Sequence, residues 1–321
     1  MTSIPEQPVQ VEDEAARAGW LYYVAGMTQD EIAREMGLSR QRAQRLVSRA
    51  VNDGLVRVRL QHPLSACLEL ESAMIRRFGL SRCRIAPSLP DGMDQTATIA
   101  PLAAAEIERV LRREDPLTIA LGTGRTMRAA VEEMVAMDCD QHKIVSLNGT
   151  IGADGAGTSY DVIMRISNRV RCHHYPMPVP VLCDSAEERN AFYGLAPVQR
   201  VAELARQADE VFVGLGQVSE SAPLMLDGFL TAGELAALRA KGAAGEIAGW
   251  VFDSQGRYMD HDANDRVGGV RVEPDTEQNR TCFAAGPSKV TALRGALSGR
   301  LFNGLVTDEK TARTVLDSPS A

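Results

Sequence analysis

From about Ser81 onward, short apolar runs alternate with longer amphipathic runs, and this alternation constrains the fold more than any other feature of the sequence. The short runs have the length of buried strands, and the longer ones have the period of helices. Strands separated by helices pair in parallel, because a parallel connection needs a crossover of a dozen or more residues. We therefore expect an α/β fold, with a mostly parallel, doubly wound sheet covered by helices on both faces. Expected strands are 83–86, 117–121, 143–147, 179–183, 210–214 and 249–252, and expected helices include 94–113, 126–137 and 290–299.

A different pattern precedes the sheet. Thr28 and Glu31 have the spacing of a capping box, which predicts a short helix over residues 29–36 after a first helix over 11–25. Gly37 permits a tight turn, and Ser39 can cap a third helix that runs to residue 52. Two short helices joined at a glycine turn predict a helix-turn-helix. The alternating run 55–60 then predicts the strand of a wing, so that this part of the chain is a winged helix-turn-helix.

The charge is unevenly distributed along the chain. The net charge is −7, yet residues 39–60 contain six arginines against the single acid Asp53. Such a basic segment in an acidic protein indicates binding to nucleic acid, because a solvated helix face would usually place acids four residues from its arginines. The alternative is a helical bundle that binds another protein. Candidates for contact with double-stranded operator DNA are Thr28, Ser39, Arg40, Gln41, Arg42, Gln44 and Arg45 in the helix-turn-helix, and Arg57 and Arg59 in the wing.

The composition excludes several other classes of protein. No apolar run is long enough to span a bilayer and the first ten residues are polar, so we expect a cytoplasmic protein with no membrane partner. The six cysteines show no framework spacing and are expected to be reduced, mostly buried thiols. Cys172-His-His174 with Cys183-Asp184 matches no zinc pattern, so neither a metal nor another cofactor is expected.

The turn after the second expected strand has the character of an anion site. Gly122 and Gly124 let the backbone approach a ligand closely, and Thr126 can cap the helix that follows. The free N–H groups of Gly122, Thr123, Gly124, Arg125 and Thr126 would then favour a phosphate or carboxylate, which the Arg125 guanidinium can also bind. The same turn also occurs in α/β proteins as a plain connection, and it lacks the endings of a nucleotide P-loop or a dinucleotide fingerprint.

Further candidates gather where ligands usually bind, beyond the carboxyl ends of the strands. Asn148 and Gly149 follow one expected strand and Asp253 follows another. Asp253 could accept hydrogen bonds from sugar hydroxyls, although its sequence context is equally that of a hairpin turn. Lys289 stands at the start of the C-terminal helix, where the helix dipole disfavours a cation. It is therefore either a second phosphate ligand or a solvated lysine.

These observations divide the chain into four parts: a disordered tail over residues 1–10, the winged helix-turn-helix over 11–61, a linker helix over 62–80 and an effector-binding domain over 81–321. One winged helix reads only a few base pairs, so useful specificity calls for two copies on a pseudo-palindromic site. We therefore expect self-association into a dimer or tetramer, with the linker helix as one of its elements.

The sequence resembles the SorC family of bacterial sugar-responsive transcriptional regulators from about residue 15 to 317. The likeness rests on the motifs at residues 26–39, 122–126, 245–253, 286–289 and 304–309, which occur in this order. The resemblance implies an effector domain similar to sugar-phosphate isomerases and deaminases, a phosphorylated sugar or polyol as inducer, and dimers or tetramers. It assigns phosphate binding to residues 122–126 and Lys289, and hydroxyl binding to Asp253. One departure is that Pro287 and Ser288 replace the glycines more usual before this lysine.

The sequence thus predicts a DNA-binding regulator of a carbohydrate or polyol catabolic operon, whose operator affinity a small phosphorylated sugar or polyol controls. Binding of a free, unphosphorylated polyol remains open. The competing hypothesis is an isomerase or deaminase fused to a DNA-binding domain, although a fold alone does not confer its catalysis.

Overall fold

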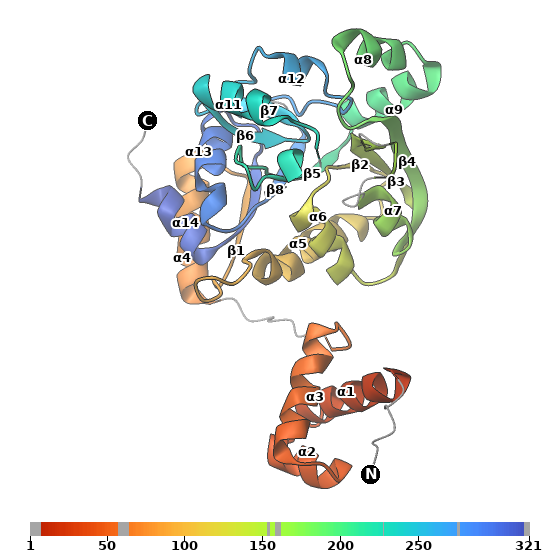
Figure 1. The fold of residues 1–321 in the computed structure, drawn as a ribbon, viewed down its shortest axis with the longest axis vertical. Coiled ribbons are helices and arrows are strands. Elements are labelled where there is room, and N and C mark those ends of the chain that lie inside the picture. The colour runs from red at the N-terminus through yellow and green to blue at the C-terminus, as the bar shows by residue number, and fades with distance from the viewer. Residues whose placement is uncertain are drawn as a thin grey trace. The chain divides into compact units, whose positions relative to one another are not determined.

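Contacts between residues divide the chain into two units, Met1–His62 and Pro63–Ala321 (Figure 1). The computed structural model describes residues 8–56, 64–152, 155–157, 162–226, 228–274 and 277–317. Residues 1–7 of the predicted tail lie outside the described residues, as does most of the predicted wing strand, including Arg57 and Arg59.

The described residues of the first unit form three helices, α1 (Pro8–Tyr23), α2 (Gln29–Met36) and α3 (Arg40–Asn52). The capping box at the start of α2 is formed as predicted, because Thr28 Oγ1 accepts from the Glu31 amide and the Glu31 carboxylate accepts from the Thr28 amide. Gly37 ends α2 with φ +67°, and Ser39 Oγ accepts from the Arg42 amide at the start of α3. The helix α1 begins at Pro8, three residues before its predicted start. One small core joins the three helices through Ala15, Ala18, Leu21, Ile32, Ala33, Ala43, Leu46, Val47 and Ala50.

The second unit contains a seven-stranded sheet in the order β1-β9-β8-β5-β2-β3-β4. Every strand pair recorded in this sheet is parallel, which confirms the predicted fold class. The strands are β1 (Arg82–Ala86), β2 (Thr118–Leu121), β3 (Met137–Ile151), β4 (Val170–Pro180), β5 (Glu210–Gly214), β8 (Asn279–Phe283) and β9 (Gly304–Asp308).

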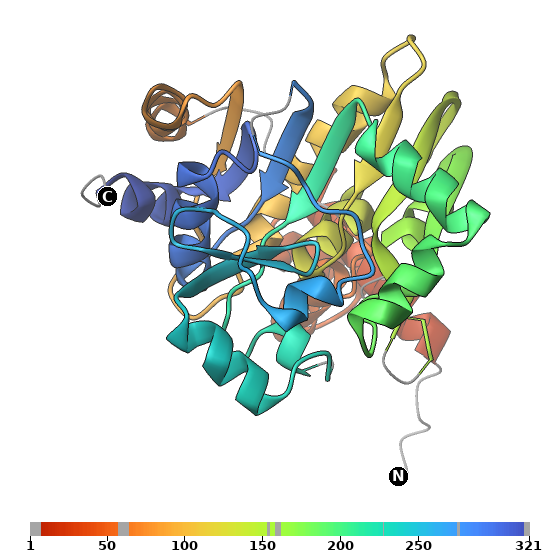
Figure 2. The same ribbon diagram turned by 90° about the horizontal axis from the view of Figure 1, so that it is seen from above.

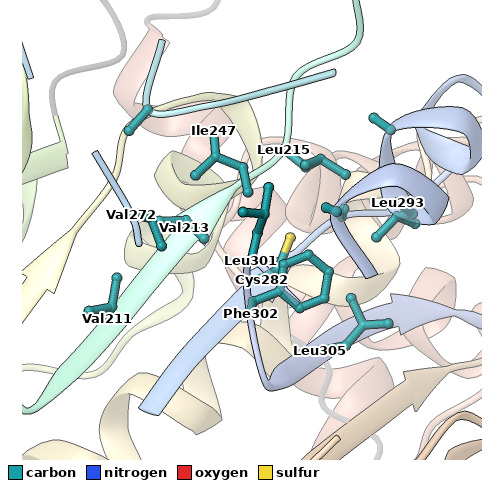
Figure 3. Close-up of a cluster of buried hydrophobic side chains, with 14 of the residues drawn as sticks. Val211, Val213, Leu215, Ile247, Val272, Cys282, Leu293, Leu301, Phe302 and Leu305 are labelled. Atoms are coloured by element: carbon teal, nitrogen blue, oxygen red, sulfur yellow. The ribbon is translucent and has the colours of Figure 1, made fainter. Parts of the chain in front are cut away.

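Helices cover both faces of the sheet (Figure 1). One core lies under α5 (Thr96–Leu111), α6 (Arg125–Glu133) and α7 (Val162–Ser167). The other lies under α4 (Ser65–Phe78), α9 (Ala196–Arg206), α13 (Val290–Ser298) and α14 (Glu309–Leu316). Figure 3 shows part of this second core, where Cys282 of β8 lies beside Leu301 and Phe302, between Val213 of β5 and Leu293 of α13. The remaining elements are α8 (Ala186–Tyr193), α10 (Pro223–Leu226), α11 (Ala232–Ala240), β6 (Ala243–Ile247), β7 (Trp250–Asp253), α12 (Asp262–Asp265) and the 3₁₀ turn η1 (Pro287–Lys289).

The helix expected as a linker is part of the second unit. The helix α4 packs against β1 and α14, and Figure 2 shows α4 beside α14 at one side of the sheet. Cys67, Leu70 and Met74 are buried in this contact, whereas Leu64 and Leu68 are exposed. The amphipathic pattern of α4 therefore serves first to cover the sheet.

One predicted strand joins a different sheet. Residues 249–252 were expected to continue the parallel sheet, but β7 pairs antiparallel with β6 in a separate two-stranded sheet. The connection consists of Ala248 and Gly249, with φ of +52° and +88°. Two central residues with positive φ form a tight hairpin turn, which leaves no room for the crossover that a parallel pair requires.

The sequence patterns also missed strands and misplaced the end of the helix after the glycine turn. The strands β6, β8 and β9 were not predicted, and the strand predicted over 179–183 overlaps only the end of β4. The strand β8 contains Arg280, which is buried and donates to the carbonyl groups of Glu273 and Leu301. The helix predicted over 126–137 ends at Glu133, and Met137 already belongs to β3. A buried arginine satisfied by distant backbone carbonyls cannot be recognised from local periodicity.

Candidate functional site

The glycine turn between β2 and α6 has an unusual backbone conformation. Gly124 is the N-cap of α6 with φ +119° and ψ 170°, a conformation essentially restricted to glycine. The helix begins at Arg125, so Thr126 is its second residue and does not cap it, contrary to the prediction. The first N–H groups of a helix have no partner within it and point outward along its axis. The turn therefore directs the amides of residues 125 and 126 beyond the carboxyl end of β2.

Asn148 of β3 fixes the entrance to this turn. Its Oδ1 accepts a hydrogen bond of 3.1 Å from the Thr123 amide, and its backbone carbonyl accepts one of 2.9 Å from Ser146 Oγ. Asn148 is buried, and the bond from the Thr123 amide holds its side chain beside the turn.

A cavity of about 90 Å³ opens above the turn. Six of the nine predicted effector residues line it: Thr123, Gly124, Arg125, Thr126, Asn148 and Lys289. The remaining lining residues come from the starts of helices, the ends of strands and the segment after α10: Thr96, Val181, Gly214, Leu215, Gly216, Leu224, Phe229, Glu246, Ala248 and Gly249. Leu215 also belongs to the core below, where it lies near Ile247 and Cys282 (Figure 3). The cavity lies at the edge where ligands bind parallel sheets.

Lys289 is a cation in an environment that disfavours its charge. It is the residue before α13, and its Nζ donates a hydrogen bond to Gln217 Oε1. Burial lowers the pKa of Lys289, the nearby Glu246 carboxylate raises it, and Arg125 lowers it further. Two cations close enough to repel each other therefore line one cavity, and an anion bound between them would relieve the repulsion.

Glu246 is a site residue that the sequence patterns did not reveal. Burial raises the pKa of its carboxyl group, against the opposing effects of a 2.8 Å hydrogen bond from the Gly249 amide and of Lys289. A side chain at Gly216 would overlap this carboxylate, which explains a glycine at that position. Glu246 stands on β6, in an antiparallel hairpin that was not predicted, so its position could not be anticipated.

The other three predicted effector residues do not line the cavity. Gly122 donates a 2.8 Å hydrogen bond to the Phe212 carbonyl, and a side chain at Gly149 would overlap the Pro180 carbonyl, so both serve close backbone packing. Asp253 is at the end of β7, four residues from Gly249 and hence roughly 13 Å along an extended strand. Its carboxylate accepts from the Gln255 and Arg257 amides and from the Arg257 guanidinium. Although burial raises the pKa of Asp253, these bonds hold it below its ordinary value.

The recognition helix α3 presents a polar face. Gln41, Gln44 and Arg45 are exposed, while Ala43, Leu46 and Val47 face the core of the first unit. Arg45 donates to the Gln41 carboxamide at 3.4 Å. Ser48, Arg49 and Asn52, which were not among the candidates, extend the same exposed face. Thr28 and Ser39 use their side chains to cap α2 and α3.

Three of the four arginines of α3 form ion pairs, which corrects the expectation that nearby acids are missing. Arg49 pairs with Asp53 at 2.8 Å, four residues later in sequence. Arg40 pairs with Asp30 of α2 at 3.4 Å, and Arg42 pairs with Glu14 of α1 at 3.0 Å. The pattern of a single helix cannot reveal partners on neighbouring helices.

Two other features of the described residues bear on function. No three His, Cys, Asp or Glu side chains among them come together where they could bind a metal ion; Cys172 and His174 are neighbours on β4, at 3.7 Å. None of the helices in the described ranges has the length and apolarity to cross a membrane.

A helix-turn-helix unit combined with an α/β unit whose cavity is lined by two cations defines a ligand-responsive DNA-binding transcriptional regulator. The chain matches the Sugar-bind family, described as a sugar-binding domain, over residues 62–317 and the MarR family over residues 18–63. It therefore belongs to the SorC family of sugar-binding transcriptional regulators, as the sequence motifs indicated.

Individual relatives span the whole chain. The erythritol catabolism regulatory protein EryD of Brucella abortus (strain 2308) is 33% identical over 307 residues, which cover 95% of this chain and 97% of that protein. The transcriptional regulator LsrR of Escherichia coli (strain K12) is 30% identical over 321 residues, with coverage of 99% and 98%. The crystal structure of the full-length sorbitol operon regulator SorC from Klebsiella pneumoniae has a TM-score of 0.69 at 24% identity, and covers 96% of this chain and 100% of that one.

Proposed function

We propose that this protein regulates a carbohydrate or polyol catabolic operon, and that a small phosphorylated sugar or polyol bound in the cavity changes its affinity for operator DNA. The observation that carries the proposal is that two cations, Arg125 and Lys289, line one cavity at the start of α6. A phosphate there would accept hydrogen bonds from the helix amides and from both cations. Gly122 and Gly149 would support the site by allowing close backbone packing.

The DNA-binding side of the proposal rests on α3. Gln41, Gln44 and Arg45 would contact base edges or phosphates, with arginine suited to guanine and glutamine to adenine. Arg40 and Arg42 would contact the DNA backbone while their acidic partners orient them. Thr28 and Ser39 would position the two helices, and Arg57 and Arg59 would contact phosphates if the wing forms as predicted.

The switch requires two arrangements of the protein that bind the effector unequally. We propose that two copies pair on a pseudo-palindromic operator, as a dimer or as part of a tetramer, and that the effector favours one spacing of their recognition helices. A ligand can shift such an equilibrium only by its difference in affinity for the two states.

Two relatives guide the choice of effector. EryD is named for erythritol catabolism, and SorC is named for the sorbitol operon. Polyol phosphates of four and six carbons therefore belong in the first set of compounds to be tested.

A catalytic role is the second candidate, and Glu246 is the observation that favours it. A carboxyl group with a raised pKa beside a lysine could act as an acid or base on a sugar phosphate. We propose that the protein is not an enzyme and that Glu246 binds a ligand hydroxyl instead. Turnover of hexose or pentose phosphates that is lost in Glu246→Gln would overturn this proposal.

A gel-shift titration tests the proposal. Operator DNA selected in vitro is bound by the wild type, and sugar and polyol phosphates are added one at a time. We expect at least one of them to change operator affinity, and we expect Arg125→Ala and Thr123→Glu to keep DNA binding while losing this response. Arg128→Ala is the matched control, because Arg128 lies on α6 outside the cavity and pairs with Glu132. Tight binding of a phosphorylated ligand with no change in operator affinity would refute the switch.

A further inference from the structure

Asp308 is buried at the centre of a hydrogen-bond network that joins separate segments of the second unit. It is the last residue of β9 and the N-cap of α14, and it is the one acid among the described residues with no exposed surface. Its Oδ1 accepts from Ser88 Oγ at 2.6 Å and from the Thr311 amide at 3.1 Å. Its Oδ2 accepts from the Gly286 amide at 3.0 Å and from Thr311 Oγ1. The carboxylate thus binds the loop after β1, the turn after β8 and the first turn of α14.

The cap of α14 accounts for only part of this network. An N-cap side chain accepts from an amide in the first turn of its helix, and the Thr311 amide provides that bond. The bond from the Gly286 amide has no such role. Although burial raises the pKa of Asp308, the hydrogen bonds from Ser88, Thr311 and Gly286 hold it below its ordinary value. The group is therefore an ionised acceptor, fixed in one position by the segments that donate to it.

Gly286 connects the network to the cavity. It is the N-cap of η1 with φ +98°, and Lys289 is the last residue of this turn. The Lys289 amide donates to the Gly286 carbonyl at 3.1 Å. The Gly286 amide in turn donates to Asp308 and, at 2.8 Å, to Thr311 Oγ1. A movement of Lys289 toward a bound anion would therefore act on the start of α14.

The helix α14 connects the network to α4. The two helices pack against each other, and Figure 2 shows them side by side. Cys67 and Leu70 of α4 belong to the same core as Ala312 and Val315 of α14. Burial raises the pKa of the Cys67 thiol, and the nearby Glu309 of α14 raises it further. Since α4 is the first helix of the second unit, the chain that leaves the recognition unit enters the fold at the element that α14 contacts.

We propose that Asp308 is a positioning residue that couples the cavity to α4. An anion that attracts Lys289 shifts η1, and the hydrogen bond from Gly286 to Asp308 transmits this shift to α14 and so to α4. The inference rests on the proposed function, since it needs an anion at Lys289, but it gives a role to a residue outside the cavity. Coupling requires an element with two arrangements, and we assign that role to η1 together with α14.

Asp308→Asn breaks the link to Gly286 selectively. The carboxamide oxygen can replace Oδ1 as acceptor for Ser88 and for the Thr311 amide, which keeps the helix cap. The NH₂ group then faces the Gly286 amide, and two donors cannot bind each other. Ser88→Ala is the matched control, because it removes a hydrogen bond to the same carboxylate and leaves the Gly286 link intact.

Anisotropy of fluorescent operator DNA, with and without a saturating polyol phosphate, measures the coupling in the full chain. The probes are erythritol 4-phosphate and sorbitol 6-phosphate. For the wild type and Ser88→Ala we expect the probe to change operator affinity by at least about 5-fold. For Asp308→Asn we expect calorimetry to show that the probe still binds, and the change in operator affinity to fall below about 2-fold.

Hydrogen exchange of the same proteins locates the transmission. In the wild type, the probe should alter exchange in residues 286–289, 309–316 and 65–78. In Asp308→Asn, it should alter exchange in residues 286–289 alone. A purely structural role would change exchange equally with and without the probe, and would leave the response to the probe as in the wild type.

The outcomes separate this inference from the proposed function. A wild-type change of operator affinity in Asp308→Asn would overturn the inference and leave the proposed function intact. Loss of probe binding in Asp308→Asn, or an equal loss of coupling in Ser88→Ala, would also overturn the inference alone. If Asp308→Asn does not fold, Thr311→Val decides, because it removes the other acceptor of the Gly286 amide; it should reduce the coupling, and wild-type coupling would refute the role. If no sugar or polyol phosphate acts on the wild type, both proposals fail.

Discussion

Replacing Lys289 by methionine should weaken effector binding. The variant keeps the length of the side chain but removes a cation whose charge is disfavoured by burial and by Arg125. A hydrogen bond to a charged group contributes about 1.5–3 kcal/mol, so we expect the effector dissociation constant to rise by roughly 10- to 150-fold. Because the exchange also leaves the Glu246 carboxylate and the Gln217 carboxamide without their cation, the free energy of unfolding should decrease as well.

Calorimetry with the effector and urea unfolding of the free protein measure the two quantities. Lys310→Met is the control, because Lys310 is exposed and pairs with Asp91 at the surface. That variant should change neither effector affinity nor stability by more than about 1 kcal/mol. The reasoning is refuted if Lys289→Met binds the effector like the wild type and unfolds more easily, since Lys289 would then be a structural residue.

Three further predictions concern other parts of the chain. Gly124→Ala should cost about 1–3 kcal/mol in urea unfolding, because φ is +119° there and no neighbouring atom blocks a Cβ; an unchanged midpoint would contradict this account of the turn. Thr28→Ala should destabilise the first unit by about 1 kcal/mol through loss of the capping box, measured by thermal unfolding of that unit; an unaltered transition would show that the cap contributes nothing. Since burial raises the pKa of Glu246 in the folded protein, its contribution to stability is present at low pH and is lost as pH rises through that pKa. The stability of Glu246→Gln relative to the wild type should therefore increase from pH 4.5 toward neutrality in urea unfolding, and a constant difference would be inconsistent with the shift.

Local chemistry accounts for what the sequence predicted well. The boundaries of α2 and α3 follow from Thr28, Gly37 and Ser39, because caps and turns are determined by residues a few positions apart. The glycine turn at residues 122–126 was predicted for a similar reason. Two glycines between a strand and a helix predicted a backbone conformation that side chains forbid, and Gly124 has one, with φ +119°.

Long-range pairing accounts for what the sequence did not predict. The hairpin of β6 and β7 brings Glu246 into the cavity and leaves Asp253 in a turn at its far end. Glu246 and Asp253 are close together in sequence. Because β6 and β7 pair antiparallel, Glu246 lies at the cavity and Asp253 does not. The ion pairs of Arg40 and Arg42 likewise depend on the packing of three helices.

Thermodynamic linkage tests the central claim most directly. If one cavity controls DNA binding, the factor by which a saturating effector changes operator affinity must equal the factor by which saturating operator changes effector affinity. We predict the same factor of at least about 5-fold in both measurements for the wild type, typical of allosteric coupling, and a factor of one for Thr123→Glu. A wild-type protein that binds effector and operator with no mutual effect would contradict the account.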